Sequence, residues 1–188
     1  MVTGAATLGL AGLATPSVLL AQNPTAPGVW PVKALSPVQT ELKNAVIVLR
    51  DTLRRLDATA VRLERASATN SVAVIKSSGR VLVDDCTRAA RGAARMQEQV
   101  KSYSTSDKRG DAVLQRFRAS VLMLNHAMTA CSRDAAAALA PPARTTQLDS
   151  VRKVAVAAAA AYDRAVHELM RTLSIPLDPK GHKSAVEL

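Results

Sequence analysis

The sequence predicts an all-α protein in which four long helices form an up-down-up-down four-helix bundle. Apolar residues recur at alternating spacings of four and three through residues 37–175, which places them on one face of a helix. Short polar or proline-containing breaks divide this region into four segments, so consecutive helices should run antiparallel. Aromatic residues make up only 2% of the 188-residue chain, which argues against an all-β domain.

The first helix is expected to begin just after Ser36. Ser36 is a favourable N-cap residue, Pro37 suits the first helical position, and Gln39 stands three residues after the cap, where its side chain can complete a capping box. The apolar stripe that follows consists of Leu42, Val46, Leu49, Leu53, Leu56, Ala60 and Leu63. These residues should face the core of the bundle.

The second helix follows a polar break at residues 67–71. Residues 72–83 are also compatible with a β-hairpin that turns at residues 77–79. We favour the helix, because the helical spacing runs through this segment and continues well beyond it. The stripe consists of Ile75, Gly79, Leu82, Cys86, Ala89, Ala93, Met96, Val100 and Tyr103.

The third and fourth helices are separated by the proline pair at residues 141–142, and a break at residues 105–110 precedes the third. Residues 174–176 end the fourth helix, and residues 176–188 are predicted to be a flexible tail. The third stripe consists of Leu114, Phe117, Val121, Leu124, Met128, Cys131, Ala135 and Ala138. The fourth consists of Leu148, Val151, Ala155, Ala158, Tyr162, Ala165, Leu169 and Thr172.

Two segments precede the bundle. Residues 1–21 are apolar and carry no charge, so they resemble the apolar part of an export signal, although the basic residues that usually precede it are missing. A retained membrane anchor and an ordinary apolar tail are the alternatives. Residues 22–36 contain three of the chain's prolines and are predicted to be an extended linker. Trp30 in this linker either packs on the flank of the domain or contacts a partner or a membrane interface.

The two cysteines fall on the stripes of the second and third helices. In an antiparallel pair of helices, residues that face each other have a constant index sum, and the midpoint between Cys86 and Cys131 lies inside the break at residues 105–110. The two thiols should therefore lie at the same height, and a disulfide between them is sterically plausible. We favour the disulfide and an oxidising compartment over two free thiols in the cytosol.

The sequence contains no recognisable active site. His126 and His167 each follow a stripe residue by two positions and should point away from the core, and His182 lies in the tail. Metal sites in bundle cores use inward glutamates and Glu-x-x-His pairs, and the chain has no Glu-x-x-His. It also lacks a nucleophile motif, a phosphate-binding loop, a zinc spacing and a haem-attachment motif. We expect no enzymatic activity, no metal and no cofactor.

Charge carries more information about function. The chain has a net charge of +10, and residues 37–175 hold 22 basic and 13 acidic residues. Arginines gather outside the predicted core stripes, at Arg50, Arg54 and Arg55 on the first helix and at Arg88, Arg91 and Arg95 on the second. They form either a solvated face or a surface that docks onto acidic protein surfaces or anionic headgroups.

Together these features predict a non-enzymatic, exported bundle that acts as an extrinsic accessory subunit of a larger membrane-associated complex, with a respiratory or photosynthetic complex as one candidate host. We expect it in the periplasm or another extracytoplasmic space, with Trp30 and the six arginines as its contacts. A stand-alone periplasmic ligand-binding or stress-protective bundle is the first alternative. A cytosolic nucleic-acid-binding protein is the second, although the sequence has no helix-turn-helix, zinc-finger or RNA-recognition motif.

Overall fold

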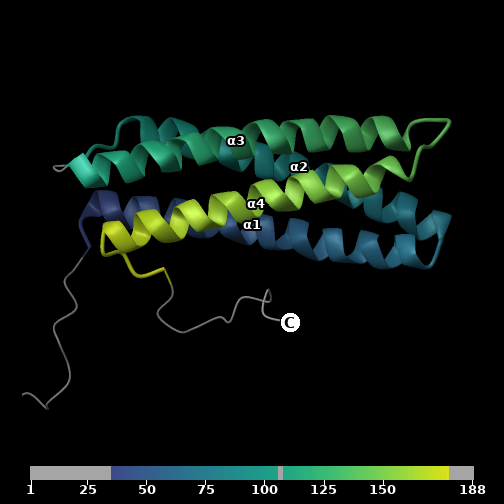
Figure 1. Cartoon of the computed structure of the whole chain (residues 1–188), viewed down its shortest axis with the longest axis horizontal. Coiled ribbons are helices and arrows are strands. Elements are labelled where there is room, and N and C mark those ends of the chain that lie inside the picture. The colour runs from purple at the N-terminus through teal and green to yellow at the C-terminus, as the bar shows by residue number, and fades with distance from the viewer. Residues whose placement is uncertain (1–34, 106–107, 178–188) are drawn as a thin grey trace, which may run out of the picture. The chain divides into compact units, whose positions relative to one another are not determined.

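The structure, a computed structural model, describes residues 35–105 and 108–177 and consists there of four α-helices without strands. The helices are α1 (Pro37–Ala68), α2 (Val72–Lys101), α3 (Lys108–Leu139) and α4 (Gln147–Thr172). They form the predicted up-down-up-down four-helix bundle (Figure 1). Residues 72–83 lie within α2, so the hairpin alternative is excluded.

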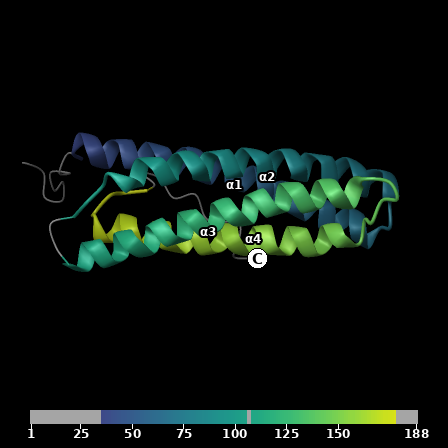
Figure 2. The same ribbon diagram turned by 90° about the horizontal axis from the view of Figure 1, so that it is seen from above.

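Each helix packs against its neighbours in the sequence, and α4 closes the bundle against α1. The α1–α2 and α3–α4 connections lie at one end of the bundle, and the α2–α3 connection lies at the other (Figure 2). The helices contain 26 to 32 residues. This length, about 40–48 Å at 1.5 Å per residue, lets a narrow core extend over many turns.

The N-terminus of α1 has the predicted capping box. The Gln39 backbone N–H donates to Ser36 Oγ at 3.2 Å, and the Ser36 N–H donates to Gln39 Oε1 at 3.0 Å. The same Gln39 side chain donates to the carbonyl oxygen of Leu173 at 3.3 Å. A local sequence signal therefore also connects the start of α1 to the end of α4.

The buried residues of the first three helices follow the predicted stripes. Every predicted stripe residue in α1, α2 and α3 is buried. Tyr103 lies two residues beyond the end of α2 and is half-buried. The alternating spacing of four and three thus identified the correct face of each of these helices.

In α4 the predicted stripe is fully buried at only half of its positions. Leu148, Ala155, Tyr162 and Leu169 are buried as predicted, but the four residues between and after them are only half-buried. These are Val151, Ala158, Ala165 and Thr172. The helix buries Arg152, Val166 and Met170 instead. Within residues 154–161, which are all alanine or valine, hydrophobicity does not distinguish one side of the helix from the other.

Helix α2 lies close to its neighbours because small residues occupy its buried face. Cys86, Ala89 and Ala93 are all 0% exposed. A Cβ atom placed on Gly79 would lie 3.0 Å from Leu148 Cδ1 and 3.1 Å from a methyl carbon of Leu139. The end of α3 and the start of α4 therefore occupy the space that a side chain at position 79 would need.

A guanidinium group from α3 caps the C-terminus of α2. Arg118 donates to the carbonyl oxygens of Val100 at 2.9 Å and Lys101 at 3.2 Å, and also to that of Tyr103. These are carbonyls that a helix end leaves without intrahelical partners, and a cation there also interacts favourably with the helix dipole. Arg118 thus fixes the α2–α3 connection.

Several sequence predictions lie outside the described residues. They concern the export signal or anchor at residues 1–21, Trp30 and most of its linker, and the tail from residue 178 onward. Within the described ranges, no helix is long and apolar enough to cross a membrane.

Candidate functional site

A pair of cysteines joins α2 and α3 across the core. As the index sum predicts, Cys86 and Cys131 lie level, with their sulfur atoms 2.11 Å apart and their Cα atoms 6.0 Å apart. Both residues are buried, with exposed fractions of 0% and 3%. The next residues along the two helices, Thr87 and Ser132, share a hydrogen bond between their hydroxyl groups at 2.7 Å. The disulfide is therefore a structural element that reductants in solution do not reach directly.

A second polar contact joins α1 to α2. Thr59 Oγ1 donates to Asp85 Oδ2 at 2.6 Å, and Arg88 forms an ion pair with the other oxygen of the same carboxylate. The Asp85 side chain is only 4% exposed, so a lost partner would leave a buried charge uncompensated. Asp85 lies beside Cys86 in the sequence. Two adjacent residues of α2 therefore connect it to both neighbours, Asp85 to α1 by a hydrogen bond and Cys86 to α3 by the disulfide.

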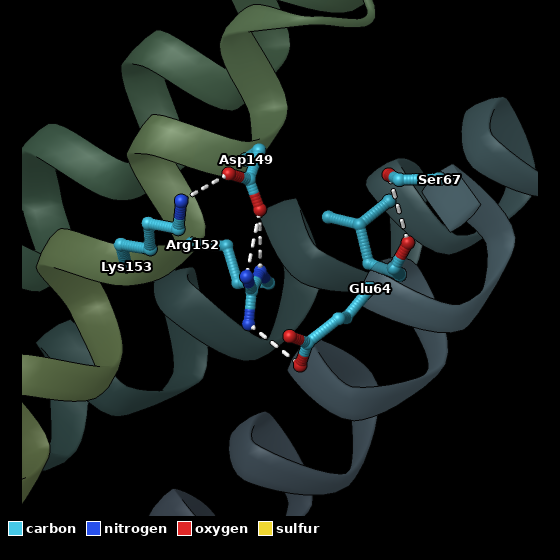
Figure 3. A network of polar contacts seen from close by, with 6 residues as sticks. Glu64, Ser67, Asp149, Arg152 and Lys153 are labelled. Carbon is cyan, nitrogen blue, oxygen red and sulfur yellow. Dashed lines mark hydrogen bonds and ion pairs between the residues drawn. The ribbon is translucent and has the colours of Figure 1, made fainter.

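A third polar network joins the start of α4 to the end of α1 (Figure 3). Arg152 is 9% exposed, and its guanidinium group contacts Asp149 Oδ1 at 2.7 Å and Glu64 Oε2 at 3.1 Å. Lys153 Nζ lies 2.7 Å from Asp149 Oδ2. Hydrogen bonds from Lys153 and Arg152 lower the pKa of the Asp149 carboxyl group. These partners make burial of the Arg152 guanidinium possible, because a buried charge needs compensating contacts.

A fourth network joins the middle of α1 to α4. Arg50 Nε lies 2.8 Å from Asp163 Oδ1, and the other oxygen of Asp163 lies 3.3 Å from His167 Nε2. The Arg50 side chain is only 11% exposed. Nearby in the core, Tyr162 packs against Phe117 with ring centroids 5.9 Å apart, and its hydroxyl group has no hydrogen-bond partner among the described residues. Burial raises the pKa of Tyr162 above its usual value, so the phenol stays neutral and acts as a packing residue.

The structure divides the six arginines that the sequence singles out. Arg50 is held within the bundle by Asp163, and Arg54 pairs on its own helix with Asp51 at 2.8 Å. Arg88 pairs with Asp85, although its side chain remains 52% exposed. The other three, Arg55, Arg91 and Arg95, are exposed and have no ion-pair partner in the described parts of the chain.

Three of these arginines share one outward face of α2. At about 100° per residue, Arg88, Arg91 and Arg95 fall within an arc of roughly 60°. We call these three residues the arginine row. The carboxylates of Asp84 and Glu98 flank the row, and Glu98 pairs with Lys101 at 2.7 Å. The register set by Thr59 and Asp85 brings Arg55 of α1 to the level of Arg88.

A shallow groove of about 340 Å³ lies between α1 and α2, and Arg95 is the residue of the row that lines it. Its apolar lining comes from Ala45, Val48 and Leu49 on α1 and from Gly92 and Met96 on α2. At Gly92 the floor is formed by Leu49, because a Cβ at position 92 would lie 3.0 Å from Leu49 Cδ1. Arg95 and Gln99 on α2, and Glu41, Asn44 and Thr52 on α1, are the polar residues of the lining. We call this feature the Gly92 groove.

The described residues do not present the geometry of a metal centre. No group of three or more histidine, cysteine, aspartate or glutamate side chains within residues 35–105 and 108–177 is arranged to hold a metal ion. His126 is exposed on α3, as predicted, and His167 is held by Asp163. The combination of apolar groove and adjacent cations is suited to binding another surface.

Comparison with known protein families, with curated proteins and with solved structures finds no match to this chain. The assignment of a function therefore depends on the geometry described above.

The buried disulfide leads to a testable expectation about thiol chemistry. Unreduced protein, denatured before alkylation, should show no reactive thiol, and two should appear after reduction. Reduction should lower the melting temperature, because a loop of 45 residues closed by a disulfide contributes about 4 kcal/mol in the loop-entropy model. Mass spectrometry after alkylation and a thermal melt provide the measurements. Two alkylated cysteines in unreduced, denatured protein would contradict the disulfide.

The lowered pKa of Asp149 gives the network at the end of the bundle a defined pH dependence. The folded carboxyl group binds its proton more weakly than the unfolded one, so its stabilising effect is complete above the unfolded pKa of about 4 and is lost as pH falls through the folded value. Asp149→Asn should therefore lower the free energy of unfolding at pH 6, and its difference from wild type should shrink below about pH 4. Denaturant titrations of wild type and Asp149→Asn between pH 6 and pH 2 measure this difference in the free energy of unfolding.

Asp57→Asn is the matched control, because Asp57 is an exposed carboxylate on α1 with no ion pair among the described residues. It should change the free energy of unfolding little at either pH. A difference between wild type and Asp149→Asn that stayed constant down to pH 2 would show that this carboxylate does not stabilise the fold through its charge.

Proposed function

We propose that this protein is a non-enzymatic accessory subunit that docks, through the outer face of α1 and α2, onto a larger membrane-associated assembly in an extracytoplasmic space. The helices form a rigid frame, and the arginine row forms the electrostatic contact. Arg55 lies beside the row and extends the contact onto α1. Arg50 is assigned to the frame, because its ion pair with Asp163 holds α1 to α4.

The observation that carries this proposal is that exposed cations without an ion pair adjoin an apolar groove. Some surface cations, such as Arg116, Arg133 and Lys153, lie within 2.8 Å of a carboxylate of the chain itself, and others, such as Arg164, have no ion pair among the described residues. In the part of the chain that the structure describes, Arg91 and Arg95 have no such carboxylate, and an apolar groove adjoins them. Exposed cations beside an apolar surface favour association with an acidic partner, because charge complementarity steers the encounter and apolar burial stabilises the complex.

The disulfide supports the extracytoplasmic location. Disulfides persist in oxidising compartments and are rare in the cytosol, and this one lies on two core stripes. An uncharged apolar segment at residues 1–21 fits an export signal or a retained anchor. An export signal and a retained anchor would each place the bundle in the oxidising compartment in which a disulfide forms.

Replacement of the arginine row tests the docking. The triple variant Arg88→Gln, Arg91→Gln, Arg95→Gln should leave the membrane fraction of the producing cells at a lower salt concentration than wild type. The reason is that exposed charge contacts are screened within a Debye length of about 8 Å at physiological ionic strength. Sedimentation of membranes over a salt series, followed by immunoblotting, gives the measurement. Far-ultraviolet circular dichroism should show unchanged helicity.

A second triple variant controls for net charge. Arg133→Gln, Arg144→Gln, Arg164→Gln removes the same number of positive charges from exposed positions outside α1 and α2. Its retention should match that of wild type. Equal retention of both triple variants and wild type at every salt concentration would rule out the arginine row as the docking surface.

A further inference from the structure

We propose that the Gly92 groove is the seat of an acidic amphipathic helix of the partner, an inference that rests on the docking function proposed above. One face of that helix places apolar side chains against the exposed Val48, beside the buried Met96. Its carboxylates lie along the α2 side of the groove, opposite Arg91 and Arg95.

The apolar part of the groove is available to a partner. Val48 is 62% exposed, although it lies on the same helix as the buried Leu49 and directly precedes it in the sequence. The absence of a side chain at Gly92 lets Leu49 reach toward α2 and leaves a depression between the helices. A depression with an exposed branched side chain at its edge is suited to receive an apolar anchor from a partner.

The shape of the groove suits a helix. Its lining runs from Glu41 to Thr52 on α1 and from Gly92 to Gln99 on α2. Twelve helical positions span roughly 16 Å, which corresponds to three turns of a helix lying between the two antiparallel neighbours. Helices bind such grooves through apolar residues at i, i+3 or i+4, and i+7, spaced to face one side.

Charge selects the partner. On the α2 side, Arg95 lines the groove and Arg91 lies next to Gly92, and both are exposed without an ion pair in the described ranges. Glu98 is engaged by Lys101. The carboxylate of the lining itself, Glu41, lies on α1 at the far end of the groove from Arg91. A helix with carboxylates on that side complements the row. A second copy of this chain is a poor occupant, because a net charge of +10 on each chain makes the two copies repel.

The test uses a labelled synthetic peptide of about five helical turns, with leucines along one face and glutamates along both flanks. Fluorescence anisotropy measures its affinity for the full-length protein. Val48→Gln should weaken binding at least about tenfold, because it removes an exposed apolar contact of the groove. Met123→Gln is the matched control, since Met123 is 67% exposed on α3, away from the groove, and its replacement should leave binding unchanged.

Methyl NMR locates the peptide independently of affinity. In protein labelled at the methionine methyl groups, the peptide should shift the signal of Met96, which lines the groove, and leave that of Met123 unchanged. A peptide with lysine in place of glutamate should cause no shift. Peptide affinity unaffected by Val48→Gln, or a shift at Met123 instead of Met96, would overturn the assignment of the groove.

Two further outcomes separate this inference from the proposed function. If the peptide fails to bind while the arginine-row variant still leaves membranes at lower salt, the groove is not the seat and the electrostatic docking stands. If the bundle binds vesicles of anionic phospholipid and Val48→Gln binds them as well as wild type, the partner is the lipid surface and the helix proposal is wrong. If the peptide fails to bind, and retention of the protein on membranes depends neither on salt nor on the arginine row, both proposals fail.

Discussion

The close approach of α2 to the helices around it is the constraint on which the rest of this structure depends. Cys86, Ala89 and Ala93 have no exposed surface, and Gly79 leaves room for leucines from α3 and α4. Small side chains allow the backbones to come close enough for two cysteines with Cα atoms 6.0 Å apart. At Gly92 the same use of a small residue on the other side of α2 creates the groove against α1. One helix thus supplies both the cross-link of the core and the candidate docking surface.

The small residues on the buried face of α2 bury little apolar area per turn, so other contacts add to the stability of the bundle. Polar networks stabilise the contacts of α1 with α2 and with α4, which the disulfide does not join. Asp85 holds Thr59 of α1, Arg50 holds Asp163 of α4, and Arg152 holds Glu64 near the end of α1. In the described part of the chain these networks pair the carboxylates of Asp85, Asp149, Asp163 and Glu64 with cations of the bundle itself. Exposed arginines such as Arg91 and Arg95 are left without an ion pair.

The bundle and the register of its cysteines could be predicted from the sequence, because leucine, valine and alanine stripes with a strict spacing define one face of α1, α2 and α3. The same reasoning located the buried face of α4 less sharply, because residues 154–161 are apolar on every side and the burial of Arg152 depends on Glu64, 88 residues earlier in the chain. The sequence pattern places Arg50 among the contact residues. Its ion pair with Asp163 joins residues 113 positions apart, and no local pattern in the sequence reveals it. The Gly92 groove was not predicted, although a glycine beside Arg91 in a helix was its signal in the sequence.

The free energy of unfolding of an Ala89→Leu variant tests the central claim most directly. Ala89 is 0% exposed and lies one turn from Cys86 on the face of α2 that packs closely. If close packing of α2 determines the structure, three added carbon atoms have no space, and the variant should be less stable by about 1–3 kcal/mol or more in a denaturant titration. Unchanged or increased stability would contradict the account, because it would show that the neighbours of α2 have room for a larger side chain.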